Sequence, residues 1–392
     1  MSERLLKDQN VQNNYMDEEY AEFEEFTLSN KVKWIIGIVG GVFTIGILYL
    51  FVVLIPSYYI PEASELSDIV KVGELNATLS PLEDPRIKQL GLDAPYDYEG
   101  GDDDLDNEES DEKGDIDTIG TSSKKVVERI ILIGDIHGHY LAFRKLLRKL
   151  KYNSKSDHII MLGDFISKGP DSLQVLDFAI NNNLGCIIGN HEYAVLQNYA
   201  LFHHLTVPKF TDNSSHSSSR FTIKDSFNSD PEFLLAKKLQ PKHIQYINHC
   251  PLMLKLGEVP LHKWSNFGGI KSAPGIAVHA GIRWDLSLED QIPEDTLEMR
   301  SYVGPFFNET TSDPHEKHSI SWSKYYNKKN LPNKNVVYYG HDARRGLNLK
   351  KYTKGIDTGC DRGEKLTAMM IWLQKTPTGV IHYAERPVHV NC

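Results

Sequence analysis

Six Asp, His and Asn side chains stand in short, Gly-containing motifs that follow apolar runs. They are Asp135, His137, Asp164, Asn190, His279 and His341. Carboxylate, amide and imidazole ligands of this mix suit first-row divalent cations such as zinc, manganese, cobalt or iron. Two such cations, roughly 3.5–4 Å apart, can share a bridging carboxylate and activate a water for in-line attack on phosphorus. The residue types therefore predict a two-metal hydrolytic site.

Three of the motifs follow strand-like apolar runs, at residues 130–133, 159–162 and 184–188. Between these runs, apolar residues at helical spacing predict one helix containing residues 143–150 and another over residues 171–181. This β-α-β-α-β order predicts parallel strands joined by right-handed crossovers. Ligands collect at the carboxyl ends of such strands, so the three motifs should meet at one edge of one sheet.

Further strand-like runs occupy residues 251–256, 275–278, 336–339, 367–373 and 379–383. The second and third of these end in histidine motifs, His279-Ala280-Gly281 and Gly340-His341. A second sheet packed on the first would bury these runs. Residues 203–230 are rich in Ser, Asn, Asp and His, and we interpret them as an inserted surface loop, with a lid over the site as the alternative.

The formal charge of −10 is divided unevenly along the chain. Residues 1–117 contain 8 Lys and Arg against 27 Asp and Glu, whereas residues 118–392 contain 35 against 26. An acidic leader with a balance of −19 is therefore joined to a basic body with a balance of +9. A basic body attracts anionic partners, although net charge determines association rather than fold.

Residues 34–55 form a run of 22 residues without a charge, which is enough to cross a bilayer as a helix. The run is too long, and begins too far along the chain, for a cleaved signal peptide. Lys31 and Lys33 precede it and the next basic residue is Lys71, so the positive-inside rule places residues 1–33 in the cytosol and the remainder across the membrane. The translocated side carries three N-x-S/T sequons, at Asn76, Asn213 and Asn308. We expect a single-pass type II membrane glycoprotein with a lumenal body.

Residues 56–123 are predicted to be an acidic, largely disordered tether. Residues 96–117 carry twelve acids and one Lys, and a run of like charge cannot bury enough surface to fold. An acidic docking or autoinhibitory segment facing the basic body is the alternative interpretation. The four cysteines, Cys186, Cys250, Cys360 and Cys392, permit three pairings if all are oxidised. Cys186 lies in an apolar run, which favours a buried thiol.

The motif series GDIHG, GDFISKGP, GNHE, HAG and GH, over about residues 126–385, resembles the calcineurin-like metallophosphoesterases of the phosphoprotein-phosphatase superfamily. The resemblance implies an α/β fold, a four-layer αββα sandwich over residues 124–392, and a dinuclear metal site. Asp135, His137 and Asp164 would hold one cation. Asp164, Asn190, His279 and His341 would hold the other, so that Asp164 bridges the two. His191 would be the acid that protonates the leaving group.

One motif departs from the protein phosphatases of this superfamily, which carry GDxVDRG. Here Ser167 replaces the Asp that would orient His191, and Lys168 replaces the Arg that would clamp phosphate. Lys supplies a point charge where Arg supplies a planar fork, so the replacement is not neutral. The KGP form, together with GHDARRGL and IDTGC, is similar to the ApaH-like branch, whose members cleave phosphoanhydrides. With an N-terminal anchor, this branch resembles the fungal vacuolar, zinc-dependent endopolyphosphatases.

We therefore expect a hydrolase of phosphoanhydride bonds that uses two divalent cations, with zinc favoured over manganese, cobalt, iron or magnesium, at the vacuole membrane. Its expected substrate is inorganic polyphosphate, with no nucleic-acid partner. Candidate phosphate contacts are Lys168, Arg283, Arg344 and Arg345, with Lys350 and Lys351 as further candidates. The rival activities are a serine/threonine protein phosphatase and a dinucleoside polyphosphate or cap hydrolase. A catalytically inactive, membrane-anchored binding protein is disfavoured because every metal-ligand position is filled.

Overall fold

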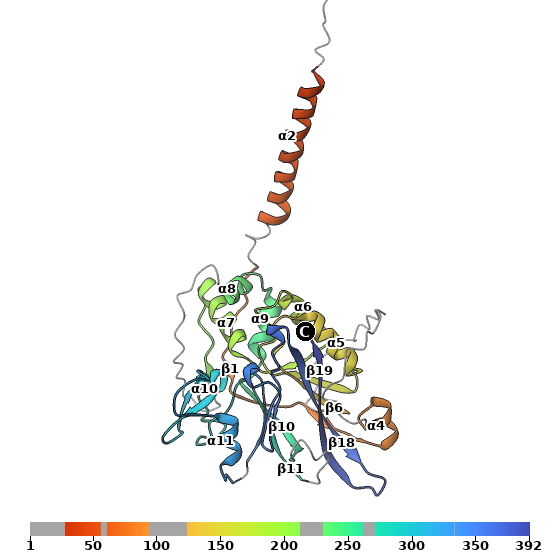
Figure 1. Cartoon of the computed structure of the whole chain (residues 1–392), viewed down its shortest axis with the longest axis vertical. Helices are drawn as coiled ribbons and strands as arrows, with labels where there is room; N and C mark the ends of the chain where they lie inside the picture. Colours follow the sequence, from red (N-terminus) through yellow and green to blue (C-terminus); the bar gives the residue numbers. More distant parts are fainter. Residues whose placement is uncertain (1–27, 56–60, 94–123, 212–229, 262–270, 333) are drawn as a thin grey trace, which may run out of the picture. The chain divides into compact units, whose positions relative to one another are not determined.

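The computed structural model describes residues 28–55, 61–93, 124–211, 230–261, 271–332 and 334–392. The chain divides into two compact units, Met1–Ile60 and Pro61–Cys392, which are considered separately below. The first unit contains one long helix, and the second contains all the strands (Figure 1).

The N-terminal unit is built on α2 (Asn30–Tyr49), which continues as a π-helical turn, η1 (Leu50–Leu54). The two together span 25 residues with a mean hydropathy of 2.5. At 1.5 Å per residue this is about 37 Å, more than the roughly 30 Å hydrocarbon core of a bilayer. In the described part of the chain no side chain of α2 is buried. The helix has the length and the composition of a membrane anchor.

The first sheet of the body carries three parallel strands at its centre and edge. In sheet order its strands are β19 (Ile381–Asn391), β18 (Lys365–Lys375), β6 (Arg129–Ile133), β7 (Asp157–Met161) and β8 (Gly185–Cys186), with β4 (Pro81–Leu82) also paired to β18. The three strands β6, β7 and β8 are parallel, as predicted, and β18 runs antiparallel to β6. Their helical crossovers are α5 (Tyr140–Lys149) and α6 (Ser172–Asn181).

The second sheet has six strands and places both histidine motifs at the end of parallel strands. Its order is β16 (Asn348–Leu349), β17 (Thr353–Gly355), β15 (Val336–Tyr339), β11 (Ser272–Val278), β10 (Met253–Pro260) and β2 (Val72–Glu74). Strand β15 is parallel to both β11 and β17, so the residues that follow β11 and β15 emerge on the same side.

The two sheets pack face to face between layers of helices (Figure 1). Alternate residues of a strand point to opposite faces, and β6 follows this rule. Ile130 and Leu132 lie in the core between the sheets, whereas Ile131 and Ile133 lie in the core shared with α5. On the outer side of the second sheet, the ring of Trp322 from α11 (Trp322–Lys328) packs 4.7 Å from that of Tyr339. These layers confirm the predicted αββα sandwich.

Further helices and short strands connect these layers. They are β5 (Lys125–Val127), α7 (Asn190–Phe202), β9 (Phe210–Thr211), α8 (Pro231–Ala236), α9 (Pro241–His249), α10 (Pro293–Glu298), β12 (Ser301–Val303), β13 (Glu309–Thr311), β14 (Ser319–Ser321), η2 (Ala343–Arg345) and η3 (Cys360–Arg362). Helices α7 and α8 bracket the segment that the sequence suggested was an insertion. The interpretation of residues 203–230 as a surface loop is wrong at residues 210–211, which form β9.

The prediction of a disordered tether over residues 56–123 is wrong for residues 61–93. This segment forms β1 (Ile69–Val70), β2, β3 (Ala77–Leu79), β4 and α4 (Asp84–Leu90). Its strands pair in parallel with β9, β10, β5 and β18 of the body. The spaced apolar residues of the segment, among them Ile69, Leu75 and Ile87, are buried, whereas the acidic run that suggested disorder lies at residues 96–117, outside the described residues.

Two disulfides join the four cysteines, Cys186 to Cys250 and Cys360 to Cys392. The prediction of a buried thiol at Cys186 is therefore wrong. Strand β8 is only two residues long and lies at the edge of its sheet, next to the end of α9, so the Cα atoms of Cys186 and Cys250 are 5.2 Å apart. Disulfides persist in oxidising compartments, which agrees with a translocated body.

A buried ion pair fixes the start of the two central strands. Arg129 of β6 and Asp157 of β7 are 1% and 2% exposed. The guanidinium donates from Nε and Nη2 to the two carboxylate oxygens at 2.8 and 2.6 Å, and from Nη1 to the Leu150 carbonyl at 3.0 Å. Both charges are thus fully paired at the end of the strands opposite to the motifs.

Candidate metal centre

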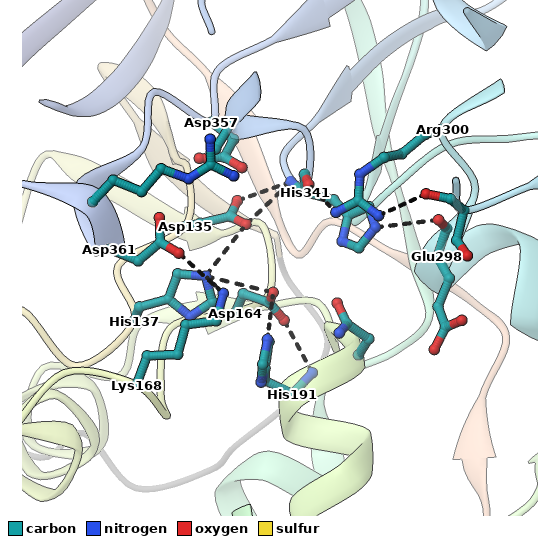
Figure 2. Close-up of a pocket in the computed structure, with 14 residues that line it drawn as sticks. Asp135, His137, Asp164, Lys168, His191, Glu298, Arg300, His341, Asp357 and Asp361 are labelled. Carbon is teal, nitrogen blue, oxygen red and sulfur yellow. Dashed lines mark hydrogen bonds and ion pairs between the residues drawn. The ribbon is translucent and has the colours of Figure 1, made fainter. Parts of the chain in front are cut away.

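All six predicted metal ligands meet where the strands of both sheets end. Asp135 and His137 follow β6, Asp164 follows β7, and Asn190 begins α7. His279 and His341 follow β11 and β15 of the second sheet. Figure 2 shows the side chains of Asp135, His137, Asp164 and His341 directed toward one another. The site therefore spans both sheets, and neither sheet alone could complete it.

Close backbone approaches explain the glycines of these motifs. A Cβ at Gly189 would overlap a carboxylate oxygen of Asp164, and a Cβ at Gly340 would overlap a carboxylate oxygen of Asp135. Three of the ligand residues themselves adopt positive φ, with values of 46° at His137, 48° at Asp164 and 65° at His341. Non-glycine residues rarely adopt this conformation, and such strain gathers at functional sites.

The first group of ligands surrounds one oxygen of Asp164. The Nε2 atom of His137 lies 3.7 Å from Asp164 Oδ2 and 3.9 Å from Asp135 Oδ2. The Nε2 atom of His191 lies 3.8 Å from the same Asp164 oxygen. His137 is 3% exposed, and its Nδ1 atom has no hydrogen-bond partner within the described residues. These spacings leave room for a cation between the side chains.

The second group surrounds the other oxygen of Asp164. His279 Nε2 lies 3.4 Å from Asp164 Oδ1, 2.9 Å from Asn190 Oδ1 and 3.2 Å from His341 Nδ1. His279 Nδ1 donates to the Leu162 carbonyl at 2.8 Å, which leaves a lone pair on Nε2 directed into the site. Two imidazole nitrogens and two oxygens converging in this way need a positive charge between them, so the donor set fits a divalent cation.

Asp164 is the only ligand common to both groups in the described part of the chain. Its Oδ2 faces His137 and its Oδ1 faces His279. The predicted bridging position of this carboxylate is thus compatible with the geometry, and the role itself remains a proposal.

Electrostatics also favour bound cations. Burial, with the charges of Asp357 and Asp164, raises the pKa of the Asp135 carboxyl well above its usual range. Burial raises the pKa of Asp357 to about 6. Burial lowers the pKa of His137 to about 4, so its imidazole is neutral near pH 7 and has a lone pair for a metal. The repulsion among these carboxylates would be relieved by positive charge at their centre.

Glu192 holds two of the ligand loops in register, a role that the sequence alone did not suggest. Its carboxylate is fully buried and accepts hydrogen bonds from the backbone N–H groups of Asp164 at 2.6 Å, Gly189 at 2.9 Å and Ile166 at 3.1 Å. Burial, reinforced by the charge of Asp164, raises the pKa of Glu192 to about 7. The GNHE motif therefore ends in a residue that ties the loop after β8 to the loop after β7.

His191 also has a carboxylate partner, which corrects an inference from the sequence. Ser167 in place of Asp suggested that this imidazole lacks an orienting acid. In the structure, His191 Nδ1 lies 2.5 Å from Glu232 Oε1, and the Ser167 hydroxyl donates to the same oxygen. Glu232 belongs to α8, 41 residues along the chain from His191, so no local motif indicated the contact.

Positive charge at the mouth of the site comes from residues that the sequence identified only in part. Lys168 lines the cavity of about 240 Å³ above the ligands. Its ammonium lies 3.0 Å from His137 Nε2 and donates to Asp361 Oδ2 at 3.2 Å. Arg300 and Arg362 line the same cavity, although no motif pointed to them.

The five other predicted phosphate contacts do not line this cavity: Arg283, Arg344, Arg345, Lys350 and Lys351. Arg283 donates to the Asp285 carboxylate at 3.0 and 2.6 Å, and Arg345 pairs with Asp342. Arg344 contacts His315 on the surface. The sequence already indicated these two ion pairs, because Arg283 and Arg345 each have an acidic residue two or three positions away.

The sequence model of the family described as calcineurin-like phosphoesterase matches residues 128–345, more than half of the chain. The zinc-dependent endopolyphosphatase of Saccharomyces cerevisiae is 30% identical over 254 residues, which cover 62% of this chain and 75% of that protein. A symmetrical bis(5'-nucleosyl)-tetraphosphatase of Wigglesworthia glossinidia brevipalpis is 26% identical, over 61% of this chain and 94% of that protein. One from Buchnera aphidicola is 39% identical, over 44% of this chain and 53% of that protein.

The matched residues contain the convergent Asp, His and Asn side chains and the strands β6, β7, β8, β11 and β15 that precede them. Both the sequence match and the arrangement of divalent-metal ligands lead to the same assignment. The chain belongs to the calcineurin-like metallophosphoesterases.

Proposed function

We propose that the protein is a two-metal hydrolase of phosphoanhydride bonds whose substrate is inorganic polyphosphate. The metallophosphoesterase chemistry follows from the family. The observation that carries the choice of substrate is the lining of the cavity, which combines the ligand cluster with Lys168, Arg300 and Arg362. Apart from imidazoles, no described residue of this lining is aromatic.

The chain's own residues divide the work of hydrolysis. Asp135, His137 and Asp164 would hold one cation, and Asp164 would share the second with Asn190, His279 and His341. Bound divalent cations supply Lewis acidity and lower the pKa of a water. The water oxygen forms a bond to phosphorus, and the bond from phosphorus to the bridging oxygen breaks. His191 presents Nε2 to the cavity and would give a proton to the departing oxygen.

The basic side chains would bind the rest of the chain of phosphates. Lys168 carries a half-exposed ammonium beside His137, so it can reach a phosphoryl group next to the scissile bond. The Arg300 guanidinium is held by the carbonyls of His341 and Ser312, both at 3.1 Å, and stands at the opposite side of the cavity in Figure 2. A linear polyanion presents charge at regular intervals, which suits cations on both sides of the metals.

A dinucleoside polyphosphate hydrolase is the nearest alternative, because two of the relatives carry that name. A purine is normally held by stacking on an aromatic side chain or a guanidinium plane. The cavity has guanidinium groups but lacks Phe, Tyr and Trp among its described lining residues. The lining therefore favours a substrate that consists of phosphate alone.

We expect the full-length protein in detergent to cleave long-chain polyphosphate faster than a phosphoserine peptide by at least about a hundredfold. A serine alkoxide needs a proton as it leaves, and general acid catalysis typically supplies about 10²–10⁴-fold. A phosphate chain end is a better leaving group than a serine alkoxide, so its departure depends less on that proton. Phosphate release from polyphosphate, a dinucleoside tetraphosphate and the peptide should be measured on one preparation, with the Asp164→Asn protein as the control for contaminating phosphatases.

Gel analysis of the polyphosphate products separates internal cleavage, which gives intermediate lengths, from release of single phosphates. If the peptide were the better substrate, the anhydride proposal would be wrong and the protein would be a protein phosphatase.

We further propose that the protein is a type II membrane protein of the vacuole, with residues 1–33 in the cytosol and the body in the lumen. Lys31 and Lys33 before the anchor helix support this orientation. The two disulfides support exposure of the body to an oxidising compartment. The sequon residues Asn76 and Asn308 are exposed and accessible to glycosylation, whereas Asn213 lies outside the described residues.

Protease added to sealed vacuoles should remove only the short N-terminal tail, and the body should resist digestion until detergent is added. An antibody against the C-terminus would detect a fragment shortened by the length of the tail. Complete digestion in the absence of detergent would contradict the proposed orientation.

A further inference from the structure

Glu232 supplies a carboxylate next to His191. In the GDxVDRG motif of the protein phosphatases, the residue at position 167 would supply that carboxylate. Ser167 is 3% exposed and lies three residues after Asp164 in the loop that follows β7. Its hydroxyl donates to Glu232 Oε1, the same oxygen that contacts His191 Nδ1. An Asp at position 167 would place a second carboxylate against that of Glu232. The site therefore has room for one acid next to His191, and here the acid comes from α8.

The carboxylate of Glu232 is itself held in place. Asp230 caps α8 by accepting the Glu232 backbone N–H at 3.0 Å, and Pro231 follows as the first helical residue. The ring of Phe233 packs edge-on against that of Phe202 at the end of α7, with centroids 6.1 Å apart. The helix that carries the acid is thus anchored to α7, which carries His191 in its first turn.

The contact through Nδ1 determines which atom of His191 faces the substrate. Because Nδ1 points to Glu232, Nε2 points into the cavity, where it lies 3.8 Å from Asp164 Oδ2. The imidazole side chain is 19% exposed and the Glu232 side chain 12%, so water competes little for their hydrogen bond. A side chain held by a second, buried group loses less freedom when it meets a substrate.

We propose that Glu232 is the positioning residue for His191, and that it supplies from helix α8 the carboxylate that Ser167 lacks. This inference rests on the proposed role of His191 in the hydrolase. Glu232 acts by holding the ring so that Nε2–H is directed at the departing oxygen. Its removal should therefore lower kcat while leaving KM, the metal content and the fold unchanged.

The test uses full-length protein in detergent with polyphosphate as the substrate. Glu232→Gln, which keeps the size of the side chain, should lower kcat by roughly 10- to 100-fold, which is the loss typical of groups that orient a metal ligand and which we apply here to His191. Glu258→Gln, at an exposed position on β10, is the matched control and should have no effect. In a His191→Ala background, Glu232→Gln should change kcat by less than about twofold, because coupled residues are not additive.

A second set of variants tests whether a carboxylate at position 167 can replace the one at position 232. Glu232→Ala should be as slow as Glu232→Gln, and adding Ser167→Asp should restore most of the lost kcat by returning a carboxylate to His191 from the loop. Metal content and thermal unfolding of each variant establish that it is folded.

Additive losses in the His191→Ala background would show that Glu232 acts on the fold or the metals, and would overturn the proposal. So would a folded Ser167→Asp/Glu232→Ala protein that stays as slow as Glu232→Ala. If the Ser167→Asp protein does not fold, the His191→Ala cycle decides alone. If polyphosphate is not cleaved but a dinucleoside tetraphosphate or a phosphopeptide is, the proposed substrate is wrong, and the same cycle on that compound still decides the role of Glu232.

Discussion

Asp164→Asn should lower polyphosphate turnover by at least about a thousandfold while leaving the protein folded. Loss of a group that merely orients a metal ligand already costs roughly 10- to 100-fold, and Asp164 faces both groups of ligands directly. Asparagine keeps the shape of the side chain and one acceptor oxygen, but it replaces the other oxygen with an N–H donor and removes the negative charge. Turnover and bound zinc, measured by atomic emission, should therefore both fall.

The matched control is Asp290→Asn, which removes a carboxylate from an exposed position and should change neither quantity. Thermal unfolding of the two variants distinguishes a lost metal from a lost fold. An Asp164→Asn protein with ordinary activity would exclude the shared carboxylate and with it the two-metal mechanism.

Arg129→Ala should lower the free energy of unfolding by about 3–5 kcal/mol, although this residue lies far from the chemistry. Removing one partner of a buried ion pair leaves an uncompensated charge, and this is the usual size of the penalty. The carboxylate of Asp157 would keep only the Asn153 backbone N–H, at 2.9 Å. Urea unfolding followed by tryptophan fluorescence gives the free energy directly.

Arg86 provides the comparison, because it also makes a two-pronged contact, with Glu128, but its side chain is 32% exposed. Arg86→Ala should cost no more than about 1 kcal/mol, the usual value for a solvated pair. Replacing Arg129 and Asp157 together by Met and Leu should recover most of the stability lost by Arg129→Ala. Equal losses for Arg86→Ala and Arg129→Ala would contradict the argument from burial.

The six candidate metal ligands could be brought together from the sequence because each lies one to four residues after the end of a strand. At Asp135 and Asp164 an apolar run stops at a glycine, and the acid comes next. The period of the strands and the order of the crossovers then place the ligands at one edge. Every step in this reasoning uses residues within about ten positions of one another, where pattern and geometry are tightly linked.

Contacts between distant segments could not be found in this way. Glu232 reaches Ser167 across 65 residues, and nothing near either position indicates the other. Cys186 and Cys250 are 64 residues apart, and spacing alone left three pairings open. Arg300 donates to the carbonyl of His341, a contact decided by the folding of the segment that contains β12 to β14. Such partners are set by tertiary packing and not by local propensity.

Residues 61–93 were missed for a different reason. Their apolar side chains are spread thinly among turns, and the acidic run at residues 96–117 dominates the composition of the surrounding stretch. Leu75 and Leu82 each pack into a core supplied by the rest of the body. The segment has no core of its own, so no analysis of the segment in isolation could have predicted that it folds.

The strands formed by residues 61–93 determine which proteolytic cuts can separate the body from the N-terminal helix. A protease that cut the chain between residues 93 and 124 would not separate the hydrolase from the apolar helix α2. The N-terminal fragment would keep β2, β3 and β4 hydrogen-bonded to β10, β5 and β18, and would keep five large apolar side chains buried: Ile69, Leu75, Leu82, Ile87 and Leu92. At roughly 1.5–3 kcal/mol for each buried side chain, the two pieces would remain together as a fragment-complemented enzyme. Separation of the hydrolase from residues 28–55 would instead require cleavage before β1.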